Sequence, residues 1–342
     1  MFDKMIKYRK LPPLSNRDDM LEVLLKEQYG YLPPKPDKLE WTVSDPLVKN
    51  FCAGKATLNR VDITCFMGKS TFTFPVYAVV PTKQAKHPFF VHINFRDDVP
   101  DRYMPTEELV DNGFGVLSLC YNDVTSDDGD FTNGLAGVLY ENGKRGPSDA
   151  GKIAMWAWAC HRVLDYAQTV DALDMDNAIV CGHSRLGKTA LVAAATDTRF
   201  KCGHSNDSGC CGAAITRDKD GEHLGDICSR FPFWFCENFL KYVGNEASMP
   251  FDQHFLIASI APRLAYVASA EQDVWADPVS EMLGCITAAP AWGNDGFVYE
   301  DRLPTPPDTY HAGKIGYHVR TGTHYFSRAD WLKLIEFLKK HN

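Results

Sequence analysis

The residues best suited to chemistry lie together near the middle of the chain, in Gly182-His-Ser-Arg-Leu-Gly-Lys-Thr189. An apolar run, residues 177–181, precedes this stretch, and good helix formers, residues 190–195, follow it. This pattern predicts a sharp turn from a buried strand into a helix. In a serine hydrolase, such a turn exposes a nucleophile, here Ser184, at the top of a sheet. In a nucleotide-binding protein, the same Gly-x-x-x-x-Gly-Lys-Thr spacing forms a phosphate-binding loop.

The phosphate-binding interpretation has less support from the residues. Backbone N–H groups of such a loop wrap around phosphate, so its variable positions are usually small. Three of the four variable positions are bulky here, namely His183, Arg185 and Leu186. The apolar run at 263–269 also ends in alanine and serine, and not in the carboxylate that would hold magnesium. The residues therefore favour the hydrolase.

A serine hydrolase of this kind needs an acid and then a histidine, in that order after the serine. Asp207 and Asp273 stand at predicted loop positions, and His324 lies between a predicted strand and the last predicted helix. His318 falls inside a strand pattern, which is typical of a packed histidine, and we expect structural roles for His183 and His204. The Gly-x-Ser-x-x-Gly spacing differs from the more common Gly-x-Ser-x-Gly.

The elements around these residues predict an α/β fold with a mostly parallel central sheet and helices on both faces. Continuous apolar runs at 89–95 and 114–121 are typical of strands covered on both faces, and a helix is predicted between them at 106–112. We expect one domain over 1–342, in which residues 1–40 form an N-terminal extension with a helix at 17–29 capped by Asn16. Further predicted elements are an antiparallel lead-in at 57–66 and 71–80, a helix at 150–169, a strand at 315–320, a helix at 327–340 begun by Ser327 and Asp330, and a long acidic loop at 121–148.

Composition excludes several classes of function. The 342 residues carry a formal net charge of −8, which gives no basic surface for nucleic acid. No apolar run is long enough to cross a membrane. The charged segment Met1–Lys10 leads into no apolar core of a secretory signal, and the eleven cysteines have no disulfide-framework spacing. We therefore expect reduced thiols and a cytoplasmic location.

A metal site is not expected. Several cysteines and histidines fall within one segment, but their spacing fits no structural zinc pattern: Cys202, His204, Cys210, Cys211, His223 and Cys228. We expect neither a metal nor another cofactor, and the oligomeric state is open.

The stretch Gly182–Lys188 resembles the nucleophile motif of the glucuronoyl esterases, carbohydrate esterase family 15. In that family an arginine directly follows the nucleophilic serine, and a lysine stands four residues after the serine. Further segments at 206–212, 221–222, 270–278 and 316–324 are similar to family segments in the same order. The resemblance covers about residues 150–335 and implies an α/β-hydrolase fold.

The resemblance also implies roles for individual residues. Ser184 would be the nucleophile and His324 the general base, with Arg185 stabilising the oxyanion. Asp207, where many members carry glutamate, ranks first as the acid of the triad, and Asp273 ranks a close second. Lys188, Glu222 and Trp275 would bind the sugar.

The implied reaction is hydrolysis of an ester between glucuronic acid and an alcohol. The expected partner is a small-molecule or oligosaccharide uronate ester of the kind found between xylan and lignin. For a cytoplasmic protein, small imported esters are the expected targets. The alternatives are a sugar-ester deacetylase with the same triad, a nucleotide-binding protein, and a hydrolase-fold binding protein without activity.

Overall fold

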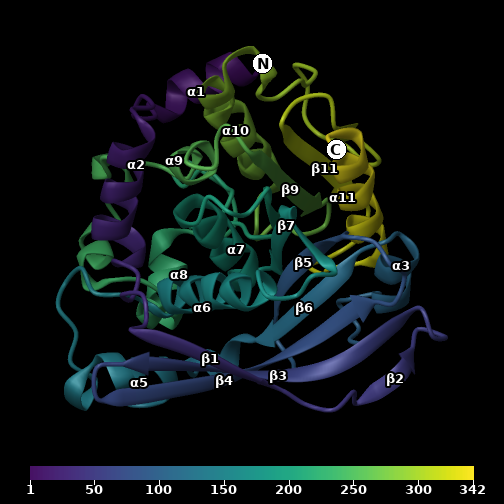
Figure 1. Ribbon diagram of the computed structural model, residues 1–342. Coiled ribbons are helices and arrows are strands. Elements are labelled where there is room, and N and C mark those ends of the chain that lie inside the picture. The colour runs from purple at the N-terminus through teal and green to yellow at the C-terminus, as the bar shows by residue number, and fades with distance from the viewer.

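The computed structural model describes all 342 residues and is organised around one eleven-stranded sheet (Figure 1). The strand order is β1-β3-β4-β6-β5-β7-β8-β9-β11-β10, and β2 pairs with β3 off this path. The strands are β1 (Lys38–Val43), β2 (Val48–Phe51), β3 (Ala56–Met67), β4 (Ser70–Pro81), β5 (His87–Asn94), β6 (Gly115–Cys120), β7 (Leu173–His183), β8 (Cys202–Asn206), β9 (Leu264–Ala270), β10 (Thr309–Tyr310) and β11 (Ile315–Arg320).

The sheet has a parallel centre and an antiparallel side. Strands β6, β5, β7, β8, β9 and β11 run parallel to one another. The predicted lead-in strands form the long hairpin β3–β4, which joins the parallel strands through an antiparallel pairing of β4 with β6. Gly68 takes a φ of 60° in the hairpin turn, a conformation that glycine adopts without steric cost. The carboxyl ends of the parallel strands therefore meet at one edge of the sheet, where a site can form.

Helices cover both faces of the sheet, as the sequence predicts. The α-helices are α1 (Phe2–Arg9), α2 (Arg17–Leu24), α3 (Thr106–Asp111), α4 (Tyr121–Val124), α5 (Gly134–Leu139), α6 (Lys152–Ala167), α7 (Arg185–Thr196), α8 (Leu224–Arg230), α9 (His254–Ala258), α10 (Pro278–Ala288) and α11 (Arg328–Lys340). Short turns of 3-10 helix occur at Glu141–Gly143, Pro232–Trp234, Glu237–Tyr242, Glu246–Ser248 and Ala289–Asp295.

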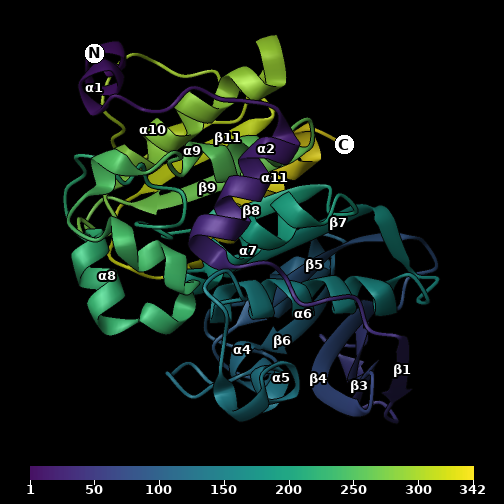
Figure 2. The ribbon, with the colours of Figure 1, turned by 90° about the vertical axis from the view of Figure 1, so that its left-hand side faces the viewer.

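Two hydrophobic clusters mark the two faces. Side chains of α2, α6, α7, α9 and α10 form the larger cluster, and Figure 2 shows α2, α6 and α7 in front of the strands. Side chains of α3 and α11 form the smaller cluster on the opposite face. On β5, Phe89 and Val91 enter the first cluster and Phe90 enters the second. Burial on both faces explains why this strand is apolar at consecutive positions.

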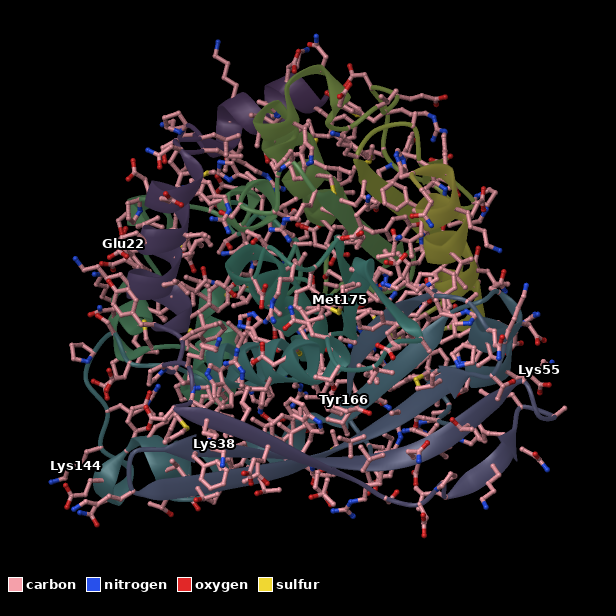
Figure 3. The ribbon with its side chains drawn as sticks, in the orientation of Figure 1. Glu22, Lys38, Lys55, Lys144, Tyr166 and Met175 are labelled. Carbon is pink, nitrogen blue, oxygen red and sulfur yellow. The ribbon has the colours of Figure 1, made fainter.

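The N-terminal residues pack on the rest of the chain. The helix predicted at 17–29 is α2 followed by a π-helical turn at Leu25–Tyr29, and the Asn16 side chain accepts a hydrogen bond from the N–H of Asp19 at 3.0 Å. Helix α1 was not predicted, although Phe2 is fully buried in the larger cluster. Further along, Tyr166 of α6 packs edge-on against Trp41 of β1, with ring centroids 6.0 Å apart (Figure 3).

Two segments differ from the sequence-based expectation. The stretch 121–148, predicted as a loop, contains α4 and α5, which bury Val124 and Leu135. Strand β8 lies in a stretch for which no strand was predicted. Its sequence Cys-Gly-His-Ser-Asn lacks an apolar pattern, yet all five residues are buried. Because β8 is covered on both faces and pairs with β7 and β9, the surroundings determine its conformation and propensity does not.

All eleven cysteines are free, and all but Cys52 are buried. None of the helices combines the length and the apolar character that crossing a membrane requires.

Candidate active site

The turn that carries Ser184 is a single residue. Strand β7 ends at His183 and helix α7 begins at Arg185, so only Ser184 lies between them. Ser184 has φ 58° and ψ −125°, a strained conformation for a residue with a side chain. A Cβ atom on Gly182 would lie 2.2 Å from the carbonyl oxygen of Leu186, which explains the glycine. No loop remains that could wrap around a phosphate, so the local backbone agrees with the nucleophile turn and contradicts the phosphate-binding alternative.

A cavity of about 380 Å³ opens at Ser184. All eight side chains singled out in the sequence line it, together with six further residues. The predicted residues are Ser184, Arg185, Lys188, Asp207, Glu222, Asp273, Trp275 and His324, and the others are Ser208, Gly209, Arg230, Phe231, Trp234 and Ala276. They come from α7 and from segments that follow β8, β9 and β11, so the parallel topology brings them to the carboxyl edge of the sheet.

His324 is paired with Asp273. The Asp273 carboxylate lies 2.5 Å from Nδ1 of His324. Asp273 is buried, whereas the His324 side chain is 45% exposed and can reach a substrate. With Nδ1 bonded to Asp273, Nε2 is the ring nitrogen that remains outside this pair.

The structure pairs His324 with Asp273, which the sequence analysis ranks second, and not with Asp207, which it ranks first. Asp207 is buried but makes no hydrogen bond to His324, and its Oδ2 lies 3.4 Å from Nη2 of Arg320. Asp207 also accepts a long hydrogen bond, 3.4 Å, from the N–H of Tyr325. The aspartate side chain is one methylene shorter than a glutamate, and it contacts Arg320 and the backbone of Tyr325. Asp207 thus supports the loop that carries His324, while Asp273 contacts the ring.

Arg185 is fixed by a partner from the segment 121–148. Its guanidinium forms an ion pair with Asp127 and lies over the ring of Trp234, with Cζ 4.6 Å from the ring centroid. Asp127 also accepts hydrogen bonds from the indole N–H of Trp234 at 2.6 Å and from the hydroxyl of Tyr121 at 3.1 Å. Arg185 is therefore held rigidly at the start of α7, where helix N–H groups without intrahelical partners favour negative charge.

Lys188 lies almost completely buried in the first turn of α7, with 4% exposure. Its ammonium group donates a hydrogen bond to the backbone carbonyl of Ser208. One donor direction is thus used by the protein, and the cavity side of the ammonium group can contact a ligand.

Glu222 and Trp275 are neighbours in the lining of the cavity. The N–H of Glu222 donates to the carbonyl oxygen of Trp275 at 3.0 Å. Gly221, at φ 69°, allows this close approach, because a Cβ there would lie 2.4 Å from the carbonyl oxygen of Val274. Trp275 is 45% exposed, so its ring is available to pack against a sugar face.

The other histidines have structural surroundings. His183 bonds to the side chain of Asn206 at 2.7 Å, and burial lowers its pKa to about 3. His318 is buried between the hydroxyl of Tyr266 and the carboxylate of Asp330. Burial likewise lowers the pKa of His204 to about 3. His183 and His204 are therefore neutral at physiological pH, and all three rings are buried.

One group of potential metal-ligand atoms occurs in the molecule. It consists of Asp207, Asp273 and His324, whose ligand atoms lie within 4.8 Å of one another. Two of the three, His324 and Asp273, are joined by a hydrogen bond. The cysteine and histidine segment from Cys202 to Cys228 gives no such group.

Several residues around the cavity were missed in the sequence. Asp127 and Trp234 hold Arg185, and Arg320 holds Asp207 and, through the carbonyl oxygens of Thr323 and Tyr325, the His324 loop. Asp127 lies in a stretch rich in acids, and nothing in its local pattern distinguishes it from Asp128 or Asp130. Only the tertiary contact identifies it.

The parallel sheet, the one-residue serine turn and the His-Asp pair on the loops after β11 and β9 define the class of protein as one with an α/β-hydrolase fold. Comparison with known proteins gives the family. The family model "Glucuronyl esterase, fungi" matches residues 63–294. The chain belongs to the glucuronoyl esterase family, carbohydrate esterase family 15.

Individual relatives agree with this assignment. The chain is 39% identical over 238 residues to "Carbohydrate esterase MZ0003" from an unknown prokaryotic organism, covering 69% of this chain and 55% of the relative. It is 26% identical over 283 residues to the "4-O-methyl-glucuronoyl methylesterase" of Podospora anserina, covering 79% of this chain and 54% of that protein. The chain thus spans about half the length of these curated relatives.

Solved structures are similar over nearly the whole chain. The glucuronoyl esterase from Solibacter usitatus superposes with a TM-score of 0.86 at 31% identity, covering 94% of this chain and 91% of that one. A promiscuous CE15 esterase from a marine bacterial metagenome gives a TM-score of 0.84 at 30% identity, covering 95% and 91%.

Proposed function

We propose that this protein is a serine esterase that hydrolyses esters of glucuronic acid. The observation that carries the proposal is that one cavity is lined by Ser184, by the paired His324 and Asp273, and by further polar side chains. The names of curated relatives, which include 4-O-methyl-glucuronoyl methylesterases, support a uronate ester as substrate.

The proposed reaction proceeds through an acyl-enzyme. Ser184 Oγ attacks the ester carbonyl while Nε2 of His324 takes its proton, and Asp273 stabilises the imidazolium. In this mechanism the first N–H groups of α7 and the guanidinium of Arg185, which lines the cavity, stabilise the developing oxyanion. When the tetrahedral intermediate collapses, the C–O bond to the alcohol breaks and His324 returns the proton to the leaving oxygen. Water then attacks the acyl-enzyme with His324 again as base, which releases glucuronic acid.

Three further groups that line the cavity match a neutral, hydroxyl-rich sugar. The Lys188 ammonium group donates to hydroxyl oxygens, the Glu222 carboxylate accepts from hydroxyls, and the Trp275 ring packs against a pyranose face. A small-molecule or oligosaccharide uronate ester fits this set of groups.

The first test is hydrolysis of benzyl glucuronate beside an acetylated xylo-oligosaccharide, with the wild type and Ser184→Ala. We expect glucuronate release by the wild type and a loss of about 10⁶-fold in kcat in the variant, because no other nucleophile lines the cavity at that position. Acetate release without glucuronate release would support the deacetylase instead. Equal rates of ester hydrolysis by the wild type and Ser184→Ala would refute a mechanism in which Ser184 is the nucleophile.

A further inference from the structure

A fully buried carboxylate lies behind the cavity, on helix α10. Glu281 has no exposed surface and does not line the cavity. Its Oε2 accepts a hydrogen bond from the hydroxyl of Ser269 at 2.6 Å, and its Oε1 accepts one from the N–H of Gly209 at 2.9 Å. The hydroxyl of Ser208 adds a weaker contact to Oε1 at 3.4 Å. A carboxylate buried away from solvent needs such hydrogen-bond donors, and here each of its two oxygens accepts from one.

The groups that Glu281 binds belong to two segments that build the site. Ser269 lies near the end of β9, directly before the turn that carries Asp273. Ser208 and Gly209 belong to the turn after β8, which also carries Asp207. The carbonyl oxygen of Ser208 is the acceptor for Lys188. One side chain therefore connects the segment that positions the histidine's acid with the segment that positions the proposed sugar-binding lysine.

We propose that Glu281 is a positioning residue, which ties the turn Ser208–Gly209 to the end of β9 and thereby holds Lys188 in its place for the sugar. This inference rests on the proposed function of the cavity. Glu281 touches neither the substrate nor the reacting atoms, and it acts on the ligand only through the Ser208 carbonyl group.

The negative charge of Glu281 and its hydrogen bonds can be separated by substitution. It faces Lys188 from α7, Asp207 after β8 and Asp273 after β9, while Tyr317 of β11 and Cys285 of its own helix complete its surroundings. Burial raises the pKa of Glu281 to about 7, against the hydrogen bonds from Ser269 and Gly209. A glutamine side chain can accept from Gly209 through its oxygen and donate to the Ser269 hydroxyl through its nitrogen. Glu281→Gln therefore keeps the hydrogen bonds to both segments without the charge, whereas Glu281→Ala removes these hydrogen bonds.

The test compares steady-state kinetics on benzyl glucuronate at pH 8. The proteins are the wild type, Glu281→Ala, Glu281→Gln, Lys188→Ala and the double variant with alanine at both positions. We expect Glu281→Ala to raise KM roughly tenfold, with a smaller change in kcat, and Glu281→Gln to stay within about threefold of wild type. Because Glu281 acts through Lys188, its effect should be lost when Lys188 is absent. In a protein that already carries Lys188→Ala, Glu281→Ala should raise KM by less than about twofold. Additive effects of the two substitutions, or no rescue by glutamine, would overturn the proposal.

Ser280→Ala is the matched control, since Ser280 is the preceding residue on α10 and is also fully buried. Its hydroxyl bonds to Arg9 and Asp277 and makes no contact with the turn after β8. It should lower the melting temperature without changing KM. A KM change as large as that of Glu281→Ala would mean that general loosening of α10 is the cause, and would overturn the positioning role.

A crystal structure of Glu281→Ala gives a readout that does not depend on esterase activity. We expect the turn Ser208–Gly209 to move and the distance from Lys188 Nζ to the Ser208 carbonyl oxygen to exceed about 3.5 Å, beyond hydrogen bonding. An unchanged turn would overturn the inference. Absence of turnover by the wild type would refute the proposed function instead, so the two failures are distinguishable.

Discussion

At the scale of single residues, two buried aspartates near His324, Asp273 and Asp207, have different hydrogen-bond partners. Asp273 accepts a hydrogen bond from His324 at 2.5 Å. Asp207 instead faces Arg320, and its Oδ1 has no partner. Burial and the nearby carboxylates Glu281, Asp330 and Asp273 raise the pKa of Asp207 well above its usual range, although Arg320 opposes them.

This difference predicts unequal effects of the same substitution. Asp273→Asn should lower kcat on benzyl glucuronate by about 10³ to 10⁴-fold, because the amide stabilises the wrong tautomer of His324 and leaves the imidazolium without its partner. Asp207→Asn should lower kcat by less than about tenfold, since Asp207 makes no hydrogen bond to His324 and asparagine keeps the shape of the side chain. Steady-state kinetics of the two purified variants, compared at equal folded fraction, provides the measurement. A larger loss for Asp207→Asn would restore it as the acid of the triad.

At the scale of elements, helix α11 anchors the loop that carries His324. Ser327 and Asp330 form a capping box at the start of α11. Asp330 is fully buried and also accepts from His318 at 2.9 Å and from Nε of Arg320 at 2.8 Å. Burial alone would raise the pKa of Asp330, but the bond and charge of His318 and the charge of Arg320 prevail and lower it to about 2. A carboxyl whose pKa is lowered by folding contributes stability that is fully present above its unfolded pKa, so its effect is complete at pH 7.

Asp330→Asn should therefore lower the free energy of unfolding at pH 7 by roughly 3 kcal/mol, since it leaves Arg320 without its buried partner. Ser327→Ala should lower it by only about 1 kcal/mol, the usual effect of a lost N-cap. Urea denaturation followed by tryptophan fluorescence measures both values. Equal losses in the two variants would indicate that Asp330 acts as a helix cap and that its ion pairs contribute little.

At the scale of the whole molecule, buried histidines set the response to acid. Burial lowers the pKa of five rings to about 3 or 4, and they lie on both faces of the sheet: His92, His161, His183, His204 and His311. The unfolded chain protonates these rings near pH 6.5, whereas the folded chain keeps them neutral, so stability falls as the pH drops below that value. Glu281 and Asp207, whose pKa values are raised, act in the opposite direction, but they are fewer.

We therefore expect the protein to unfold between about pH 5.5 and pH 4.5. One unit below pH 6.5, each neutral ring loses about 1.4 kcal/mol, and five rings lose about as much as the 5–15 kcal/mol that stabilise a typical domain. Thermal melts followed by circular dichroism in steps from pH 8 to pH 4 test this expectation. A melting temperature that stays constant from pH 7 to pH 5 would contradict it.

The sequence by itself determined the features that depend on neighbouring residues. The turn at Ser184 is specified locally, because Gly182 permits the close approach of the helix and the apolar residues on either side define a strand and a helix. The hairpin β3–β4, the buried strand β5 and the capping box of α11 follow from periodicity and from side-chain chemistry a few residues apart. For these elements the required contacts lie within one local segment.

Only the tertiary structure decided which distant groups meet. Strand β8 has no apolar pattern, and its two neighbours in the sheet impose its conformation. The choice of Asp273 over Asp207, and the pairing of Arg185 with Asp127, depend on side-chain reach across loops that are far apart in the chain. A carboxylate binds whichever donor lies within about 3 Å, and that distance is fixed by the packing of strands and helices and not by the residues beside it in the sequence.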